Sequence, residues 1–263
     1  MRFAINGFGR VGRTLLRVYA SREDARAKLT LAAINEIADA DTVVHLARYD
    51  SNYGRYPGEI ARSASSLVID QLSVPLSHVA DVAMLPWRQH QIDLVLECTG
   101  AFTDRITAEQ HLQAGASRVL FSQPAESDVD ETIVYGVNSD ALSADMTVVS
   151  AASCTTNAVV PVLATLNRAV GIEAATITTI HSLMNDQPVL DAYHHTDLRK
   201  TRAASQSIIP VDTGLAVGIE RILPYLSGKL SAHALRVPTT KVSAIELTVA
   251  TDRVCTSEDV NTA

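Results

Sequence analysis

The sequence predicts an α/β N-terminal domain with a mainly parallel sheet, followed by an α+β domain with a mixed or antiparallel sheet. Two observations support this: strands alternate with helices up to about Ser150, and longer alternating strands follow it. The 263 residues are 47% hydrophobic and 19% charged, which is a globular balance. Such a length allows two modest domains. We place the boundary near residue 152, giving domains 1–152 and 153–263.

The first domain alternates buried strands with amphipathic helices. Apolar runs predict strands at 3–5, 29–34, 92–97 and 118–121. Periodicity predicts helices at 11–19, 39–47 and 107–114, and Asp39 is suited to cap the second of these. This alternation needs crossover connections, so we expect a parallel sheet with helices on both faces.

The second domain is predicted to begin with a helix. It spans 154–169, and strands follow at 173–180, 232–237 and 242–250. In the last strand apolar residues alternate with small or polar ones, which leaves one face apolar.

Charge and cysteine content exclude several classes of protein. The net charge of -7 repels nucleic-acid backbones and anionic membranes, so we expect neither as a partner. Three cysteines do not suggest a disulfide framework. No targeting or membrane-spanning segment is found in the sequence, and we expect a cytoplasmic protein.

A glycine motif joins the first predicted strand to the first helix. Gly7, Gly9 and Gly12 form G-x-G-x-x-G in the strand-to-helix context typical of a Rossmann-type dinucleotide site. The first glycine permits a tight turn, the second lets a pyrophosphate approach, and the third lets helix and strand pack closely. The free N–H groups of Arg10 and Val11 are expected to face the anion.

An acidic residue favours NAD as the cofactor. Glu36 ends the second strand, where a carboxylate binds ribose hydroxyls and repels the 2′-phosphate of NADP. Thr99 and Gly100 follow a further strand at the same sheet edge, and Ser122 follows the next. We expect these three also to contact the cofactor. The alternative is a plain glycine turn with a solvated acid beyond it.

The predicted nucleophile is Cys154. Ser153 is suited to cap the helix that follows, which places Cys154 in its first turn, where the helix dipole favours thiolate. The alternative is an inert core cysteine, but the small and hydroxylated neighbours are not core-like.

His181 is the predicted base, because it ends a buried strand from which it can reach a thiol. The remaining histidines are predicted to be surface or packing residues, or to lie in a polar loop: His45, His78, His90, His111 and His233, then His194 and His195. None has metal-ligand spacing, and no metal is expected.

Several motifs recur in one order along the whole chain. They are residues 6–13, 152–157, 180–182, 199–204 and 236–239. In these motifs the sequence closely resembles the glyceraldehyde-3-phosphate dehydrogenase superfamily. Segments 35–40, 120–124 and 205–213, and Met184 in place of a phosphate-binding Thr, are more similar to the D-erythrose-4-phosphate dehydrogenase branch.

The resemblance implies a reaction. It implies an NAD-dependent aldehyde dehydrogenase that oxidises D-erythrose 4-phosphate to 4-phosphoerythronate through a Cys154 thioester, in pyridoxal 5′-phosphate biosynthesis. It also implies a homotetramer. Substrate or phosphate contacts are implied for Ser153, Thr155, Lys200, Thr213, Gly214 and Arg236.

Three features depart from the resemblance. Lys200 stands where the similar enzymes usually have an Arg, so a compact ammonium replaces a planar guanidinium group. Ala80 stands at the position where the similar enzymes usually carry an Arg near the cofactor. The closing region is missing, and residues 257–261 read as the cap and first turn of a helix too short to form. We expect a C-terminally truncated form of the full enzyme. Two alternatives stay open: a phosphorylating glyceraldehyde-3-phosphate dehydrogenase of glycolysis, and an inactive fragment that binds a nucleotide or a partner chain.

Overall fold

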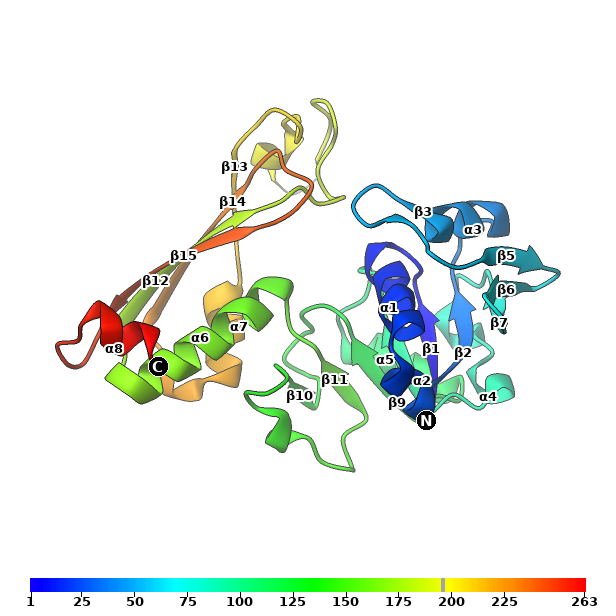
Figure 1. Ribbon diagram of the computed structural model, residues 1–263, viewed down its shortest axis with the longest axis horizontal. Coiled ribbons are helices and arrows are strands. Elements are labelled where there is room, and N and C mark those ends of the chain that lie inside the picture. Colours follow the sequence, from blue (N-terminus) through cyan, green and yellow to red (C-terminus); the bar gives the residue numbers. More distant parts are fainter. Residues whose placement is uncertain (195–196) are drawn as a thin grey trace. The chain divides into compact units, whose positions relative to one another are not determined.

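The computed structural model describes residues 1–194 and 197–263, and its chain forms two compact units (Figure 1). The N-terminal unit contains residues 1–133 and 139–153, and the C-terminal unit contains residues 134–138 and 154–263. Residues 134–138 therefore cluster with the C-terminal unit, an excursion that the sequence did not indicate.

The N-terminal unit is built on a nine-stranded sheet of order β10-β11-β9-β8-β1-β2-β7-β6-β5. Its pairings are parallel from β10 to β7 and antiparallel between β7, β6 and β5. The strands are β1 (Arg2–Asn6), β2 (Thr30–Asn35), β5 (Ile60–Ser63), β6 (Ser66–Ile69), β7 (Leu72–Ser77), β8 (Leu94–Glu97), β9 (Arg118–Phe121), β10 (Glu131–Thr132) and β11 (Val148–Ser150). A separate two-stranded sheet joins β3 (Tyr49–Asp50) and β4 (Gly54–Arg55). The predicted parallel sheet is thus confirmed, with an antiparallel extension that was not foreseen.

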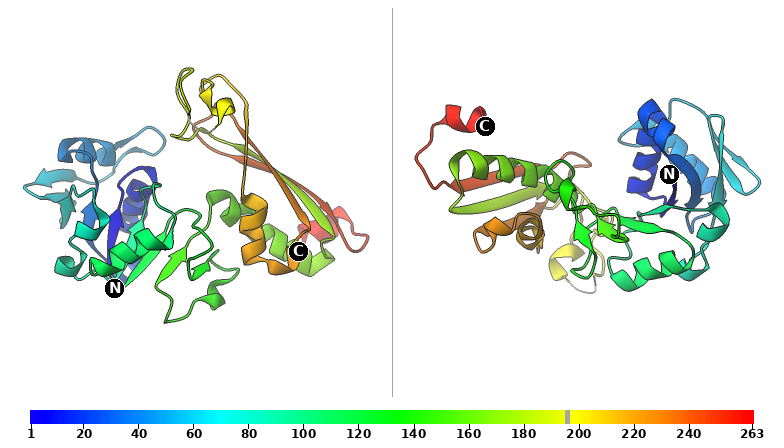
Figure 2. Two further views of the ribbon diagram at one scale, coloured as in Figure 1. Left: turned by 180° about the vertical axis from the view of Figure 1, so that it is seen from behind. Right: turned by 90° about the horizontal axis from the view of Figure 1, so that it is seen from below.

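Helices cover both faces of this sheet, as predicted. The helices of the unit are α1 (Arg10–Ser21), α2 (Glu23–Lys28), α3 (Ala40–Arg48), α4 (Trp87–His90) and α5 (Arg105–Gln113), with short 3-10 turns at Val82–Met84 and Ser139–Ala141. Phe3 and Ile5 of β1 pack in one core cluster with Leu16 of α1, whereas Ala4 packs in another with Trp87 of α4. Alternate residues of one strand therefore fill two cores, which is why residues 3–5 of this strand are all apolar. Figure 2 shows the sheet and helices from two further sides.

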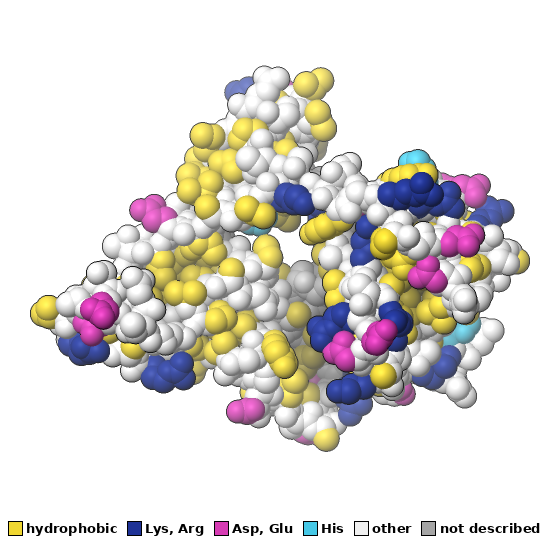
Figure 3. Space-filling model, in the orientation of Figure 1, with side chains coloured by type: hydrophobic (Ala, Val, Ile, Leu, Met, Phe, Trp, Pro, Cys, Tyr) yellow, Lys and Arg dark blue, Asp and Glu magenta, His cyan; other side chains and the backbone are white. Residues whose placement is uncertain are grey.

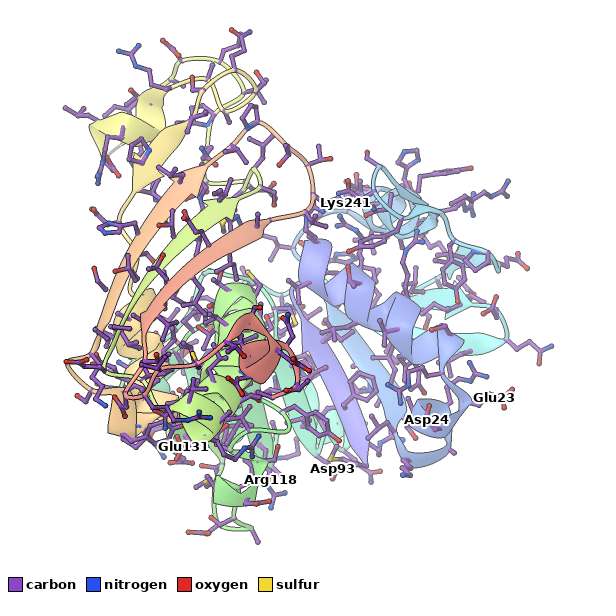
Figure 4. The ribbon with its side chains drawn as sticks, turned by 60° about the vertical axis from the view of Figure 1, so that its left-hand side comes forward. Glu23, Asp24, Asp93, Arg118, Glu131 and Lys241 are labelled. Carbon is purple, nitrogen blue, oxygen red and sulfur yellow. The ribbon has the colours of Figure 1, made fainter. Side chains whose placement is uncertain are left out.

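The sheet has two chemically different edges. Asp93 and Arg118 lie at the amino ends of β8 and β9 (Figure 4), and Asp93 Oδ2 accepts from the Arg2 N–H at 2.6 Å. The carboxyl ends of the parallel strands lie at the opposite edge, where open α/β sheets bind their ligands.

The C-terminal unit has a four-stranded mixed sheet of order β13-β14-β12-β15. Its strands are β12 (Ala174–His181), β13 (Ile209–Val211), β14 (Leu230–Arg236) and β15 (Ala244–Ala250); its helices are α6 (Cys154–Val170), α7 (Leu215–Ile222) and α8 (Ser257–Asn261), with 3-10 turns at Leu198–Thr201 and Pro224–Leu226. Only β12 and β14 pair in parallel; the other pairings are antiparallel. The mixed sheet predicted for this domain is confirmed.

One face of this sheet is apolar and buried. Ile177 of β12, Leu163 of α6 and Ile219 of α7 are completely buried. On the other face alternate residues of β15 are exposed. The view in Figure 3 shows mainly hydrophobic and uncharged side chains over these strands, whereas charges of both signs are interspersed on the N-terminal unit.

Predicted and observed elements differ mostly at their ends. The strand expected from residue 92 begins at Leu94, and the one expected from 242 begins at Ala244. Asp39 caps α3 as predicted, since its side chain accepts from the Thr42 N–H at 2.9 Å. At the C-terminal helix the prediction was wrong: Thr256, not Ser257, is the cap, and a five-residue helix forms because Thr256 and Asp259 make a reciprocal capping box. In the part of the chain that the structure describes, no helix combines the length and apolarity needed to cross a membrane.

Gly12 fixes the distance between α1 and the sheet. A Cβ on Gly12 would lie 2.3 Å from the Gly7 carbonyl oxygen and 3.1 Å from the Ile5 side chain. We therefore expect Gly12→Ala to lower the free energy of unfolding by about 1–3 kcal/mol, because backbone must move to admit the methyl group.

Denaturant unfolding, followed by circular dichroism, measures this effect. Gly9→Ala is the matched control, because a Cβ there meets nothing within 4 Å and the φ of Gly9 is an ordinary -70°. A loss of stability in Gly9→Ala equal to that in Gly12→Ala would contradict this account of the helix contact.

Candidate functional site

The glycine loop follows the last residue of β1 and ends where α1 begins. Gly7 has φ +87°, and a Cβ there would lie 2.5 Å from the backbone nitrogen of Thr99. Glycine is thus needed both for the turn and for the close approach of the segment after β8. No side chain caps the start of α1, and the position of a Cβ on Gly9 faces open space. The first turn of α1 therefore presents N–H groups that an anion can approach.

Glu36 is tied to the glycine loop. Its Oε2 accepts from the Phe8 N–H at 2.7 Å, and its Oε1 accepts from the Ala38 N–H at 3.1 Å. Each carboxylate oxygen has further lone pairs, so the side chain keeps capacity for hydroxyl donors. Glu36 thus holds the loop in place and still offers an acceptor at its rim.

A cavity of about 290 Å³ lies at this edge of the sheet. Of the residues predicted to bind a cofactor, four line it: Gly7, Gly9, Glu36 and Thr99. Arg10, Val11 and Gly12 begin α1 outside the lining, Gly100 has φ +73° directly after Thr99, and Ser122 follows β9 with its N–H bonded to the Glu97 carbonyl at 3.0 Å.

Sequence reasoning missed part of this lining. Asn6, Asn35, Val79 and Phe102 line the cavity, as does Ala80, which the resemblance placed near the cofactor. Asn6 and Asn35 are the last residues of their strands, which was a usable signal. Val79 and Phe102 lie in irregular segments, where no periodic pattern marks them.

The C-terminal unit brings the predicted nucleophile and base together. Cys154 is exposed in the first turn of α6, and its Sγ lies 3.5 Å from Nε2 of His181, the last residue of β12. The other ring nitrogen, Nδ1, lies 2.7 Å from the carbonyl oxygen of Ser182. A carbonyl can only accept, so Nδ1 carries a proton and Nε2 faces the thiol.

This pairing shifts both groups in the direction that activates a thiol. The hydrogen bond with His181 lowers the pKa of Cys154 to about 7, against an opposing effect of burial. The same bond raises the pKa of His181, against burial and the positive charge of Arg236. A thiolate and an imidazolium therefore stabilise one another, which is the form of a reactive cysteine.

Strand register places Arg236 beside the pair. β12 and β14 run parallel, and His181 is in register with Arg236 at their carboxyl ends. Burial lowers the pKa of Arg236, while the neighbouring charges of Asp186 and Cys154 oppose this effect. The Arg236 Nε is buried and has no hydrogen-bond partner among residues 1–194 and 197–263, so this guanidinium has donor capacity for an anion.

Lys200 is linked to the same cluster through Asp186. The Lys200 Nζ lies 3.1 Å from Asp186 Oδ2, and the carboxylate also interacts electrostatically with Arg236. Sequence reasoning did not assign Asp186 a role, although it follows His181 by only five residues. Met184 is 44% exposed on the same loop and offers no side-chain donor.

The remaining predicted substrate residues lie around two helix starts. Ser153 and Thr155 flank the cysteine, and the Thr155 Oγ1 lies 3.9 Å from Sγ. Thr213 and Gly214 precede α7, where the Thr213 hydroxyl accepts from the Leu215 N–H at 3.2 Å. One turn later, a Cβ on Gly218 would lie 3.8 Å from the Thr156 hydroxyl, so the two helix starts lie close together.

The other histidines take several roles. His111 is completely buried and bonded to Trp87 and Glu97, His78 Nδ1 lies 2.7 Å from the Glu36 carbonyl, and His194 Nδ1 accepts from the Asp197 N–H at 3.1 Å. His195, predicted to lie in a polar loop, is outside the described residues.

The thiol pKa values predict selective alkylation. Burial raises the pKa of Cys98 to about 12, whereas that of Cys154 is about 7. At pH 7 about half of Cys154 is thiolate and almost none of Cys98 is, so we expect Cys154 to react with iodoacetamide more than about tenfold faster. The rate should rise to a plateau above pH 7.

Peptide mapping after brief labelling measures these rates. His181→Gln removes the partner that can be protonated, so the half-maximal pH should move upward in this variant. Equal labelling of Cys98 and Cys154, or an unchanged profile in His181→Gln, would show that the pair does not activate the thiol.

Two domain models from one protein family match the chain. The model described as glyceraldehyde 3-phosphate dehydrogenase, NAD binding domain, matches residues 1–105. The model described as glyceraldehyde 3-phosphate dehydrogenase, C-terminal domain, matches residues 153–263. The first match contains the glycine loop and Glu36, and the second begins one residue before Cys154. The chain therefore belongs to the glyceraldehyde-3-phosphate dehydrogenase family, with the NAD-binding and catalytic domains of an oxidoreductase that acts on aldehydes.

Proposed function

We propose that this protein oxidises D-erythrose 4-phosphate to 4-phosphoerythronate with NAD, through a thioester on Cys154, and so supplies pyridoxal 5′-phosphate biosynthesis. The observation that supports covalent aldehyde oxidation is the 3.5 Å contact between the Cys154 thiol and His181. The choice of the four-carbon sugar rests on Met184 and on the sequence around Asp212. A homotetramer is part of the same proposal.

The N-terminal unit fits NAD. Gly9 leaves open space before the uncapped start of α1, which suits a pyrophosphate, and Glu36 offers acceptors to ribose hydroxyls. The carboxylate of Glu36 also repels a 2′-phosphate. When bound, NAD supplies the acceptor for the hydride of the aldehyde carbon.

The chain's own residues account for the remaining chemistry. The Cys154 thiolate attacks the aldehyde carbon, and the imidazolium of His181 gives its Nε2 proton to the resulting alkoxide, which forms a hemithioacetal with a neutral His181. His181 Nε2 takes the hydroxyl proton as the carbon–hydrogen bond breaks, which leaves a thioester. After His181 has released this proton to solvent, its Nε2 accepts a proton from a water molecule, which attacks the thioester carbonyl. The carbon–sulfur bond breaks, and Cys154 returns as thiolate while the acid is released.

The substrate phosphate requires cations, and the C-terminal unit offers two. The buried Nε of Arg236 has no partner in the part of the chain that the structure describes, and the Lys200 ammonium pairs with Asp186, whose charge also acts on Arg236. A Thr hydroxyl in place of Met184 would add a donor near the catalytic loop; the thioether cannot. We propose that this loss weakens binding of inorganic phosphate as an acyl acceptor and leaves the thioester to water.

The second candidate function is phosphorylating oxidation of glyceraldehyde 3-phosphate. The family match and the Cys154–His181 pair support it equally, because the two reactions differ only in the sugar and the acyl acceptor. A third possibility is a fragment that binds the nucleotide without turning over. Aldehyde oxidation separates this last possibility from the first two.

Cofactor choice tests the role of Glu36. Glu36→Gln keeps an acceptor oxygen but removes the negative charge, so we expect the ratio of the NADP Kd to the NAD Kd to fall about tenfold. Calorimetric titration with each dinucleotide gives both constants. Glu23→Gln is the control, because Glu23 is exposed at the start of α2 (Figure 4). The same ratio in wild type and Glu36→Gln would assign cofactor choice to another residue.

Substrate choice tests the proposal itself. We expect a higher kcat/KM for erythrose 4-phosphate than for glyceraldehyde 3-phosphate, and turnover without added phosphate. Met184→Thr restores one hydroxyl donor, worth ~1–3 kcal/mol or about ten- to a hundredfold, and should shift the enzyme toward glyceraldehyde 3-phosphate and phosphate dependence.

NADH formation with each aldehyde, with and without phosphate, provides the readout. Strict phosphate dependence with a preference for the three-carbon sugar would replace the first candidate by the second. NAD binding without any aldehyde oxidation would leave only the nucleotide-binding fragment.

A further inference from the structure

A row of polar side chains crosses the N-terminal sheet where four adjacent strands end. Asn6, Asn35, Glu97 and Ser77 are the last residues of β1, β2, β8 and β7. Asn6 is in register with both Asn35 and Glu97, and Asn35 with Ser77. Asn6 is 2% exposed, Asn35 3% and Glu97 0%. Burying a polar group without a hydrogen bond is energetically unfavourable, so these side chains need hydrogen-bond partners.

The hydrogen bonds along this row run in one direction. The Val79 N–H donates to Asn35 Oδ1 at 2.9 Å, and Asn35 Nδ2 donates both to the Val79 carbonyl and to Asn6 Oδ1, each at 2.9 Å. The backbone N–H and carbonyl of Val79 thus fix the orientation of the Asn35 side-chain amide. Asn35 in turn fixes the orientation of Asn6, whose Nδ2 must donate onward.

Glu97 receives this row and a second one from the opposite side. Its Oε2 accepts from Asn6 Nδ2 at 2.6 Å and lies 3.1 Å from His111 Nε2. Trp87 Nε1 donates to His111 Nδ1 at 2.9 Å, so Nδ1 is an acceptor and the ring proton is on Nε2. Asn6 and His111 therefore both donate to Oε2. An N–H donor in place of this oxygen would face two other donors.

The other oxygen of Glu97 holds the segment after β8. Oε1 accepts from the backbone N–H of Thr99 at 2.8 Å and from its hydroxyl. Glu97 therefore joins Thr99, whose backbone packs against Gly7, to Asn6, which precedes Gly7. Both segments line the 290 Å³ cavity, as do Asn35 and Val79 at the far end of the row.

We infer that Glu97 is a positioning residue for NAD: a buried acceptor that sets the spacing between the glycine loop and the Thr99 segment. Its carboxylate does not line the cavity, and it acts only through the residues that do. The inference requires NAD binding and is independent of which sugar phosphate is oxidised.

The direction of the row makes Glu97→Gln informative. The amide is almost the same size, but its NH₂ group cannot accept. If the NH₂ group faces Thr99, the hydrogen bond from the backbone N–H of Thr99 is lost. If it faces the opposite side, it meets the N–H donors of Asn6 and His111. Asn6 cannot rotate to compensate, because Val79 and Asn35 fix it. One of the two loop segments must therefore be released.

We expect Glu97→Gln to raise the NAD Kd about tenfold, as expected from the loss of buried hydrogen bonds to a charged group. Without cofactor, amide hydrogen exchange should rise in segments 6–9 and 98–101 but not in β6. Tyr56→Phe is the matched control: it removes a 3.0 Å hydrogen bond from a buried hydroxyl to Asp70, outside this row, and should leave the NAD Kd unchanged.

The double variant Asn6→Asp/Glu97→Gln tests the donor-to-acceptor direction of the hydrogen bonds, and not only their contribution to stability. The new amide at position 97 can donate to the new carboxylate at position 6, while its own oxygen still accepts from Thr99. The carboxylate at position 6 also still accepts from Asn35, so only the contact with His111 stays mismatched. We expect this variant to recover about threefold or more of the lost NAD affinity, whereas Asn6→Asp alone opposes two carboxylates and should bind worst.

If the variants fold, two results would overturn the inference. One is an NAD Kd and loop exchange in Glu97→Gln that equal those of wild type. The other is a double variant that is worse than both single variants, since additive damage indicates packing alone. Should Glu97→Gln fail to fold, recovery of folding and NAD binding in the double variant would still support the inference, and failure of both variants would refute it.

Discussion

In-register pairing of parallel strands is the constraint on which both units depend. Parallel neighbours end at one edge, so residues far apart in the chain meet there without any loop having to place them. In the N-terminal unit this aligns Asn6 with Asn35 and Glu97; in the C-terminal unit it aligns His181 with Arg236. The first alignment builds one wall of the cavity proposed to bind NAD, and the second places Arg236 beside His181, the proposed base.

Helix starts supply the second half of each site. The uncapped first turn of α1 offers N–H groups to an anion, and the first turn of α6 holds Cys154. The same partial positive charge serves a ligand in one case and a thiolate in the other. Because the thiolate is charged, the helix start and His181 act in the same direction, and the pKa of about 7 reflects mainly the histidine bond.

Local signals allowed much of this to be predicted. The glycine loop, Glu36, Cys154 and His181 each lie at a strand end or helix start that short-range patterns mark. The roles of Asp186 and His111 could not be found in this way, because they arise from contacts with residues in other segments, Lys200 for Asp186 and Glu97 for His111. The hairpin that adds β6 and β5 was also missed, since each of these strands has only four residues, and the sequence of β6, Ser-Leu-Val-Ile, does not alternate between polar and apolar residues.

The two cations proposed to bind the substrate phosphate, Arg236 and Lys200, differ in their surroundings. Arg236 is half-buried and in register with His181. Burial lowers the pKa of Arg236, and the negative charge of Asp186 opposes this effect. Lys200 carries a single charge on a flexible side chain, and its Nζ pairs with the same Asp186. A planar arginine at that position would impose one phosphate geometry, whereas an ammonium tolerates several. The cluster therefore has one half-buried cation beside His181, Arg236, and one cation on a flexible side chain, Lys200. That combination suits a sugar phosphate whose length differs from that of the three-carbon substrate.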